Sequence, residues 1–222
     1  MNERGKRLLW KGILFVAAFA VWTALLHIID VQGIGPVKTT VGFAAVNGWF
    51  HELTGVHWFL YMVTDWLGIV PVFICLLFGT IGFVQLCSRK SLRKVDFDLV
   101  LLGLYYLFVI TGYLFFEMIP INYRPILIEG RLEQSYPSST TLLVLSVMPT
   151  LALQARRRLQ SMNVIKAISI GSAIFSTFMI VGRLISGVHW LTDIIGSVLL
   201  SAGLFCIYRA AVILYCKEEQ KR

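Results

Sequence analysis

Long apolar runs that end in short clusters of basic residues constrain this sequence more than any other feature. A membrane-spanning helix needs about 20 mainly apolar residues, and six runs approach or exceed that length: residues 8–29, 66–86, 97–116, 139–153, 164–181 and 190–215. Hydrophobic residues make up 57% of the chain and charged residues 14%, whereas a soluble domain is about 45–50% apolar and roughly 25% charged. A β-barrel would instead show alternating segments of about ten residues. The sequence therefore predicts one all-α membrane domain over residues 1–222, a bundle of six transmembrane helices.

The basic residues are distributed unevenly between the two sides of this predicted bundle. Of the 20 Lys and Arg, all but four lie in the N-terminal segment, the C-terminal end and the two loops on that same side, and the exceptions are Lys38, Arg124, Arg131 and Arg183. Lys and Arg accumulate on the cytoplasmic side of a membrane, so both termini are predicted to be cytoplasmic, in a multi-pass protein of the cell membrane. Clusters at the ends of apolar runs do not form the basic stripe of a nucleic-acid surface, and no nucleic-acid partner is expected despite the net charge of +8.

Residues 39–65 fall on the outer side under this topology. They mix aromatic and aliphatic residues with glycine, asparagine and glutamate, a pattern typical of helices that lie in a membrane interface. The expectation is one or two interfacial helices on the outer leaflet. His51, His57, Trp49 and Trp58 are interpreted as interfacial anchors of these helices, since aromatic belts form at that depth.

Arg124 and Arg183 stand out because the outer side has so few basic residues. Arg124 precedes a proline, and Arg183 ends the fifth predicted helix. An ionisable residue at a membrane segment is a functional hypothesis by default. The alternative is that either arginine extends from a helix end to the headgroups. As guanidiniums bind phosphate oxygens in a bidentate manner, the pair is a candidate phosphate site.

His189 and Asp193 are four residues apart at the start of the sixth predicted helix. At that spacing two side chains share one helix face. A carboxylate there can accept the Nδ1 proton of the imidazole, which leaves Nε2 free as a nucleophile or base. The alternative is an interfacial histidine paired with an aspartate for packing.

A third candidate element is the start of the fourth predicted helix, where Tyr136-Pro137 is followed by Ser138, Ser139 and Thr140. Proline and hydroxyl residues favour a helix start, and the free amides of a first turn bind anions. A plain helix cap uses the same groups, so both readings remain open. Three outer loops thus offer guanidiniums, amides with hydroxyls, and an oriented imidazole for one phosphate.

The arrangement resembles the type 2 phosphatidic acid phosphatase superfamily, whose members share three motifs. The first is Lys, six residues, Arg-Pro; the second is Pro-Ser-Gly-His; and the third is Ser-Arg, five residues, His, three residues, Asp. Arg124 matches the end of the first motif, Ser138 falls in the second, and Arg183, His189 and Asp193 match the third at full spacing. The six predicted spans and the motifs facing away from both termini resemble the bacterial membrane branch of this superfamily.

The resemblance implies a role for each matched residue. His189 would attack phosphorus and form a phospho-histidine, and Asp193 would orient it. Arg124, Arg183, Ser138 and Ser139 would contact the phosphate. The family needs no metal or other cofactor, and the two arginines would repel a cation held by the nearby acidic residues, so no metal site is predicted.

The sequence also departs from the family pattern. Glu117 stands where the first motif has Lys, Ser139 and Thr140 stand where the second motif has Gly-His, and Gly182 replaces the Ser of the third motif. In the family the second-motif histidine protonates the leaving group, so the general acid is missing here. Thr140, Tyr136 and Glu133 are the candidate substitutes, while Glu117 is interpreted as a partner of an arginine or as lying outside the site.

The missing acid bears on the substrate. General acid catalysis is typically worth ~10²–10⁴-fold, but a lipid monophosphate leaving from a diphosphate needs little help, because the second pKa of a phosphate monoester is about 6. The sequence therefore predicts a lipid phosphate phosphatase of the outer leaflet that prefers lipid diphosphates such as polyprenyl diphosphate. A lipid phosphotransferase and a lipid-phosphate-binding protein that has lost hydrolysis remain alternatives, and the sequence names neither the lipid nor the oligomeric state.

Overall fold

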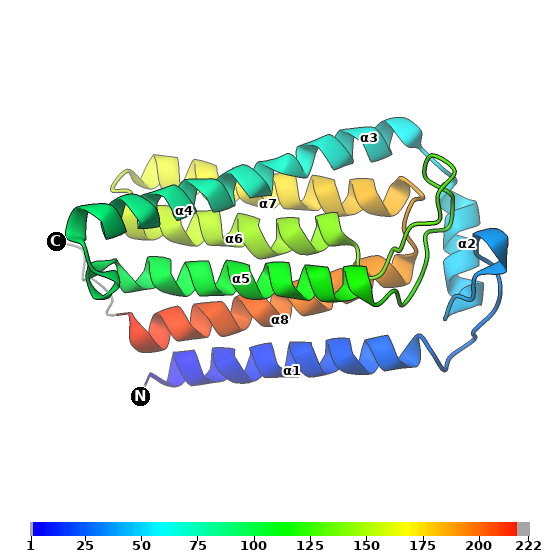
Figure 1. The fold of residues 1–222 in the computed structure, drawn as a ribbon, viewed down its shortest axis with the longest axis horizontal. Coiled ribbons are helices and arrows are strands. Elements are labelled where there is room, and N and C mark those ends of the chain that lie inside the picture. Colours follow the sequence, from blue (N-terminus) through cyan, green and yellow to red (C-terminus); the bar gives the residue numbers. More distant parts are fainter. Residues whose placement is uncertain (1, 217–222) are drawn as a thin grey trace.

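A computed structural model describes residues 2–216, and the regular structure in this range is helical. The α-helices are α1 (Glu3–Leu25), α2 (Ala44–Thr54), α3 (Trp58–Leu67), α4 (Ile69–Arg89), α5 (Phe97–Met118), α6 (Ser139–Arg158), α7 (Met162–Ile185) and α8 (Leu191–Tyr215). All but α2 run lengthwise along one bundle, and α2 lies across its end (Figure 1). The all-α membrane architecture expected from the sequence is confirmed, and a helix overlaps each of the six predicted spans.

Five stretches are long and apolar enough to cross a membrane: Glu3–Leu25, Trp58–Arg89, Phe97–Met118, Met162–Ile185 and Leu191–Tyr215. The second of these joins α3 to α4, which lie on one line (Figure 1). Pro71 explains the break between them, because it cannot donate the backbone hydrogen bond that would continue the helix. Residues 39–65 thus differ from the expected interfacial segment, since α2 covers the bundle end while α3 extends the line of α4.

The remaining lengthwise helix, α6, is more polar because it occupies the middle of the bundle. It packs against α4, α5, α7 and α8, and two of its buried polar side chains are bonded to tyrosines of its neighbours. The Tyr106 hydroxyl lies 2.6 Å from Oγ1 of Thr150, and Gln154 donates to the Tyr208 hydroxyl at 3.2 Å. Polar side chains that bond between helices hold membrane bundles together.

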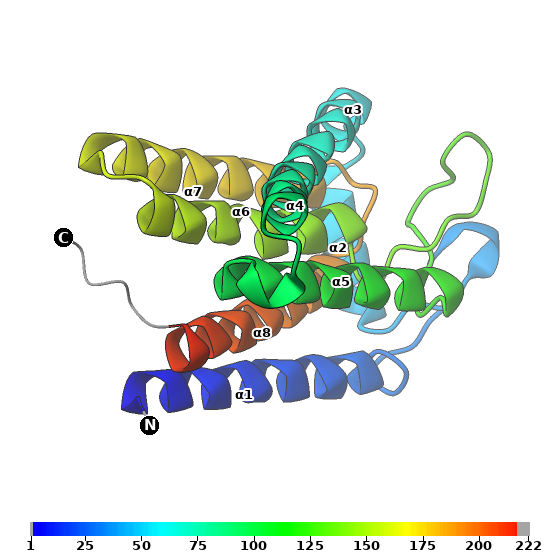
Figure 2. The ribbon, with the colours of Figure 1, turned by 60° about the vertical axis from the view of Figure 1, so that its left-hand side comes forward.

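α1 lies on the side of the bundle opposite to α3 and α4 (Figures 1 and 2). It packs mainly on α8, where two glycines meet. A Cβ on Gly12 would lie 3.0 Å from the carbonyl oxygen of Gly203. Small residues at such crossings allow close backbone approach, which provides the packing that associates helices in lipid.

One end of the bundle carries an ionic cluster. Arg158 lies 2.9 Å from Asp98 and 3.3 Å from Asp96, and Arg157 and Arg89 pair with the same two carboxylates. This cluster joins the end of α4, the start of α5 and the end of α6. α1 begins and α8 ends at this same end of the bundle (Figure 1). The loops with the candidate site residues are therefore at the opposite end.

Candidate active site

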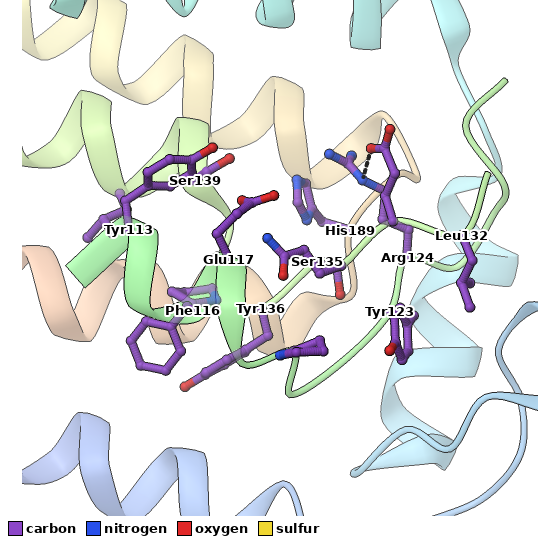
Figure 3. A pocket seen from close by; sticks show the side chains of 15 residues that line it. Tyr113, Phe116, Glu117, Tyr123, Arg124, Leu132, Ser135, Tyr136, Ser139 and His189 are labelled. Carbon is purple, nitrogen blue, oxygen red and sulfur yellow. Dashed lines mark ion pairs between the residues drawn. The ribbon is translucent and has the colours of Figure 1, made fainter. Parts of the chain in front are cut away.

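A cavity of about 490 Å³ opens among the loops at the end of the bundle away from the ionic cluster (Figure 3). Its walls come from the last turn of α5, the long α5–α6 loop, the start of α6 and the α7–α8 turn. Arg124, Ser139 and His189 all line it, so the three candidate elements of the sequence meet at one space. The polar residues of its wall are Glu117, Tyr123, Arg124, Glu133, Gln134, Ser135, Ser139 and His189.

His189 is positioned by the turn between α7 and α8. Gly187 in this turn has φ +72°, and a Cβ there would meet the carbonyl oxygen of Gly55 at 2.1 Å. The turn is also held by a bond from the His57 amide to the carbonyl of Ser186 at 3.0 Å. Only glycine fits such a left-handed, closely packed position, so the loop before α3 fixes the approach of His189 to the cavity.

The surroundings of His189 orient its ring. Nδ1 lies 3.6 Å from Oδ2 of Asp193, which is anchored by the Trp190 amide at 2.9 Å. Nε2 lies 3.2 Å from Nη2 of Arg183. A guanidinium has only donors, so Arg183 donates to the Nε2 lone pair and the proton is on Nδ1, on the side of Asp193. Nδ1 thus faces the carboxylate of Asp193, but the 3.6 Å separation is longer than a hydrogen bond, and Nδ1 has no hydrogen-bond partner among the described residues.

His189 is 3% exposed. Burial holds its pKa well below the usual value of 6.5, and the nearby charges of Arg124 and Arg183 lower it further. Both effects disfavour the imidazolium. The ring is therefore neutral near pH 7, the form in which a nitrogen lone pair can act as a nucleophile.

The guanidiniums of Arg124 and Arg183 both lie near one aromatic ring, that of Tyr61. Their guanidinium carbons are 6.0 Å and 5.2 Å from the ring centroid of Tyr61. They are 9% and 1% exposed, and among the described residues Nη1 of Arg124 and Nε of Arg183 are buried without a hydrogen-bond partner. Buried donors without partners are costly, and an anion bound here would satisfy them.

Each arginine also faces one carboxylate. Arg124 lies 3.1 Å from Glu133, the ion pair drawn in Figure 3, and Arg183 lies 3.3 Å from Asp65. Both carboxylates are more exposed than their partners. The two pairs orient the guanidiniums and leave their other donors free.

At the start of α6 the two serines have different surroundings. Ser139 lines the cavity. Ser138 is fully buried, its hydroxyl donates to Oγ1 of Thr141 at 3.1 Å, and its carbonyl accepts from the Ser197 hydroxyl. The Ser138 side chain is thus engaged within the first turn of α6, and Ser139 is the hydroxyl that a bound anion would meet.

The three candidate substitutes for the missing acid are placed elsewhere or already engaged. The Tyr136 hydroxyl lies 2.7 Å from Thr23 of α1, and burial raises its pKa. Glu133 is paired with Arg124. Thr140 lines a second cavity and contacts the α3–α4 junction at Gly68. Tyr136, Glu133 and Glu117 all line the cavity of His189, and of the two carboxylates only Glu117 is without an ion pair among the described residues.

The second cavity, of about 420 Å³, lies between α4, α5 and α6 and is mainly apolar. Tyr113, Ser139 and Leu142 line both cavities. The polar cavity therefore adjoins this apolar cavity at the first turn of α6.

Sequence reasoning missed Tyr61 and Asp65, because residues 39–65 were interpreted as interfacial. These two residues are four apart on α3 and share the face that meets the arginines. One signal was available, since Asp65 is a carboxylate at the start of an apolar run, where an ionisable residue indicates function.

At Gly182 the sequence departs from the family pattern, which has Ser there. The contact between α3 and α7 explains this departure. A Cβ at residue 182 would lie 2.6 Å from Cγ2 of Thr64, and the next nearest atoms are at 3.5 Å or more. The Thr64 methyl thus fills the space that the side chain of a serine would use. The close approach brings Tyr61 and Asp65 to the guanidiniums.

We expect Gly182→Ala to destabilise the protein by about 1–3 kcal/mol, the usual cost of overpacking, and to reduce activity. Thr64→Ser removes the clashing methyl and keeps the hydroxyl that bonds to Leu60 and Tyr61. The double variant should therefore recover most of both losses, as measured by thermal unfolding in detergent and by turnover. Additive losses in the double variant would contradict this account.

Among residues 2–216, no group of three or more His, Cys, Asp or Glu side chains is placed to hold a metal ion. The acidic residues near the cavity face the two arginines or His189, except for Glu117. The two guanidiniums are thus the groups at this site that could bind an anion.

Comparisons with known proteins find a family and a similar fold. A family model described as the PAP2 superfamily matches residues 79–215. A crystal structure described as the first transmembrane PAP2-type phosphatidylglycerolphosphate phosphatase from Bacillus subtilis is similar in fold, with a TM-score of 0.59 and 18% sequence identity over 96% of this chain and 98% of that one. No curated protein matches the chain.

Proposed function

The chain belongs to the PAP2 superfamily, and from this premise we propose that it is a membrane phosphatase that hydrolyses lipid phosphates through a phospho-histidine at His189. The observation that carries the proposal is the 3.2 Å contact of His189 Nε2 with Arg183, beside a cavity that His189 and Arg124 both line. The chemistry follows from this geometry without a metal ion or other cofactor.

The phosphate would bind between the two guanidiniums and the first turn of α6. Its oxygens would accept hydrogen bonds from the buried donors of Arg124 and Arg183, from the free amides of that turn and from the Ser139 hydroxyl. As Arg183 turns to the phosphate, the Nε2 lone pair of His189 is released. Ser138 would contribute through its place at the helix start.

In the first step Nε2 attacks phosphorus, and the bond from phosphorus to the leaving oxygen breaks with its electron pair. The ring gains positive charge, which Asp193 stabilises at Nδ1. The arginines stabilise the charge on the transferred phosphoryl oxygens. In the second step water attacks phosphorus, the electron pair of the P–N bond returns to Nε2, and inorganic phosphate leaves.

The apolar cavity between α4, α5 and α6 would hold the beginning of the lipid chain, since it adjoins the polar cavity at Ser139. The site lies at the bundle end away from the basic clusters, and the positive-inside rule then assigns it to the outer leaflet. A lipid that reaches the cavity from the bilayer would keep its chain in apolar surroundings.

We infer that the preferred substrate is a lipid diphosphate. No group that lines the cavity replaces the missing acid in the way the sequence suggested, and a lipid monophosphate is a leaving group that requires little protonation. The expected result is that purified enzyme releases phosphate from polyprenyl diphosphate with a kcat/KM at least about tenfold above that for phosphatidic acid, because loss of a general acid typically costs ~10²–10⁴-fold and should slow the monophosphate far more than the diphosphate.

The measurement is inorganic phosphate release from both lipids in the same mixed micelles. The His189→Ala variant serves as the blank for contaminating phosphatases. Faster turnover of the monophosphate would reject the diphosphate preference, and release from neither lipid would reject the phosphatase.

A further inference from the structure

Glu117 is the carboxylate of the cavity that has no cationic partner among the described residues. It lies in the last turn of α5, is solvent-exposed and lines the cavity with Arg124 and His189. In Figure 3 its side chain points into the cavity, toward the side where His189 lies. Its surroundings therefore differ from those of a surface glutamate.

The other carboxylates near the cavity are engaged. Glu133 pairs with Arg124 and Asp65 with Arg183, while Asp193 lies behind the imidazole at Nδ1. None of these three can accept a proton at the cavity without leaving a cation or the His189 ring unpaired. Glu117 can accept a proton, because its carboxylate oxygens face the space where a reacting water would lie.

The proposed second step needs such an acceptor. A water that attacks the phosphorus of phospho-His189 must lose a proton, and a positioned base typically contributes ~10²–10⁴-fold. The departing Nε2 is occupied by the breaking bond, and the guanidiniums have no acceptor. A carboxylate in the cavity supplies the function that the other lining groups lack.

We propose that Glu117 is the general base that activates water for hydrolysis of phospho-His189, an inference that rests on the proposed phosphatase function. The water oxygen forms a bond to phosphorus while the P–Nε2 bond breaks and its electron pair returns to Nε2. The water proton passes to the Glu117 carboxylate and then to solvent. Inorganic phosphate leaves, and the neutral imidazole is restored.

The same carboxylate is suited to a diphosphate substrate in the first step. A lipid monophosphate leaves without receiving a proton, so Glu117 can remain ionised throughout that step. The repulsion between Glu117 and the bound phosphate is offset by the two guanidiniums. The glutamate at this position is thus consistent with a site that needs a base and no acid.

The test is Glu117→Gln, which keeps the shape of the side chain and removes the base. With polyprenyl diphosphate labelled with ³²P at the terminal phosphate, we expect a burst of one lipid monophosphate per enzyme, followed by turnover slower by on the order of 10²-fold. Labelled phospho-enzyme should accumulate, with the acid lability and base stability of a phospho-histidine. Glu129→Gln is the matched control, because Glu129 is an exposed glutamate of the α5–α6 loop and does not line the cavity.

Two further variants distinguish a general base at residue 117 from a side chain with a purely structural role. Glu117→Asp should recover part of the turnover, and Glu117→Ala should be accelerated by added formate, which supplies a carboxylate to the vacated space. Turnover of Glu117→Gln equal to that of the wild type would overturn the proposal. The proposal would also be overturned if Glu117→Gln lost both the burst and the turnover while its thermal unfolding stayed unchanged.

The outcome for the wild-type enzyme separates this inference from the function on which it rests. If wild-type enzyme hydrolyses the lipid and His189 becomes labelled, but Glu117→Gln neither slows turnover nor accumulates label, only the base assignment fails. If the wild type forms no label at His189 under rapid quenching, the phospho-histidine mechanism fails and the base assignment fails with it.

Discussion

Replacing His189 with Ala should lower phosphate release by on the order of 10⁴-fold or more, the largest effect expected of any single substitution here. Removing a nucleophile eliminates the covalent step itself, and loss of one member of a catalytic unit commonly costs as much as loss of the whole unit. Because Ala is smaller and the ring is buried, the cavity should remain open to the phosphate. The measurement is steady-state phosphate release from polyprenyl diphosphate by purified protein.

The matched control is His57→Ala. His57 lies at the same end of the bundle, is exposed and bonds through Nε2 to the carbonyl of Thr54, and it should tolerate the change. The same experiment distinguishes an enzyme from a binding protein, since His189→Ala should still bind the lipid diphosphate. Wild-type protein that binds lipid diphosphate but releases no phosphate would favour the binding protein.

Arg183→Ala should give the second largest effect, a decrease in kcat/KM of about 10²–10³-fold, as seen when a preorganised donor to a developing anion is removed. Arg183 contacts His189, Asp65 and the ring of Tyr61, so its loss removes both a phosphate donor and the group that positions the attacking nitrogen. Arg183→Lys should fall between the wild type and the alanine variant. It keeps the charge but not the bidentate geometry.

Arg131→Ala provides the comparison for charge alone. Arg131 is an exposed arginine of the α5–α6 loop that does not line the cavity, and its removal should change kcat/KM little. Equal losses for Arg131→Ala and Arg183→Ala would mean that the arginines act through the general positive field of this end. That result would contradict a site built around two specific guanidiniums.

The elements that sequence reasoning predicted well are those determined by local sequence, through apolar runs and the spacing of residues along a helix. The apolar runs predicted the membrane-spanning class of helices, and the spacing of Arg183, His189 and Asp193 corresponds to one helix end, one turn and the first turn of the next helix. Arg124 could be assigned to the same site only through its motif, because no local rule connects residues about 60 positions apart.

Other features depended on tertiary packing and could not be read from the sequence. Whether Ser138 or Ser139 meets the cavity depends on the rotation of α6 against α8. The hydroxyl of Tyr136 is directed to Thr23 because α1 packs against α8 on that side. The role of α3 was hidden because its composition suits an interface as well as a helix that continues into the bundle.

The polar character of α6 has a consequence for how the chain is made. This helix is absent from the five stretches apolar enough to cross a membrane unaided, and it carries fully buried Thr150 and Gln154 whose partners are tyrosines on α5 and α8. A translocon that releases helices into lipid one at a time would not readily release α6 until α5 is in place and α8 has been synthesised. Biogenesis of this protein is thus expected to require that several helices be retained beside the translocon and released together.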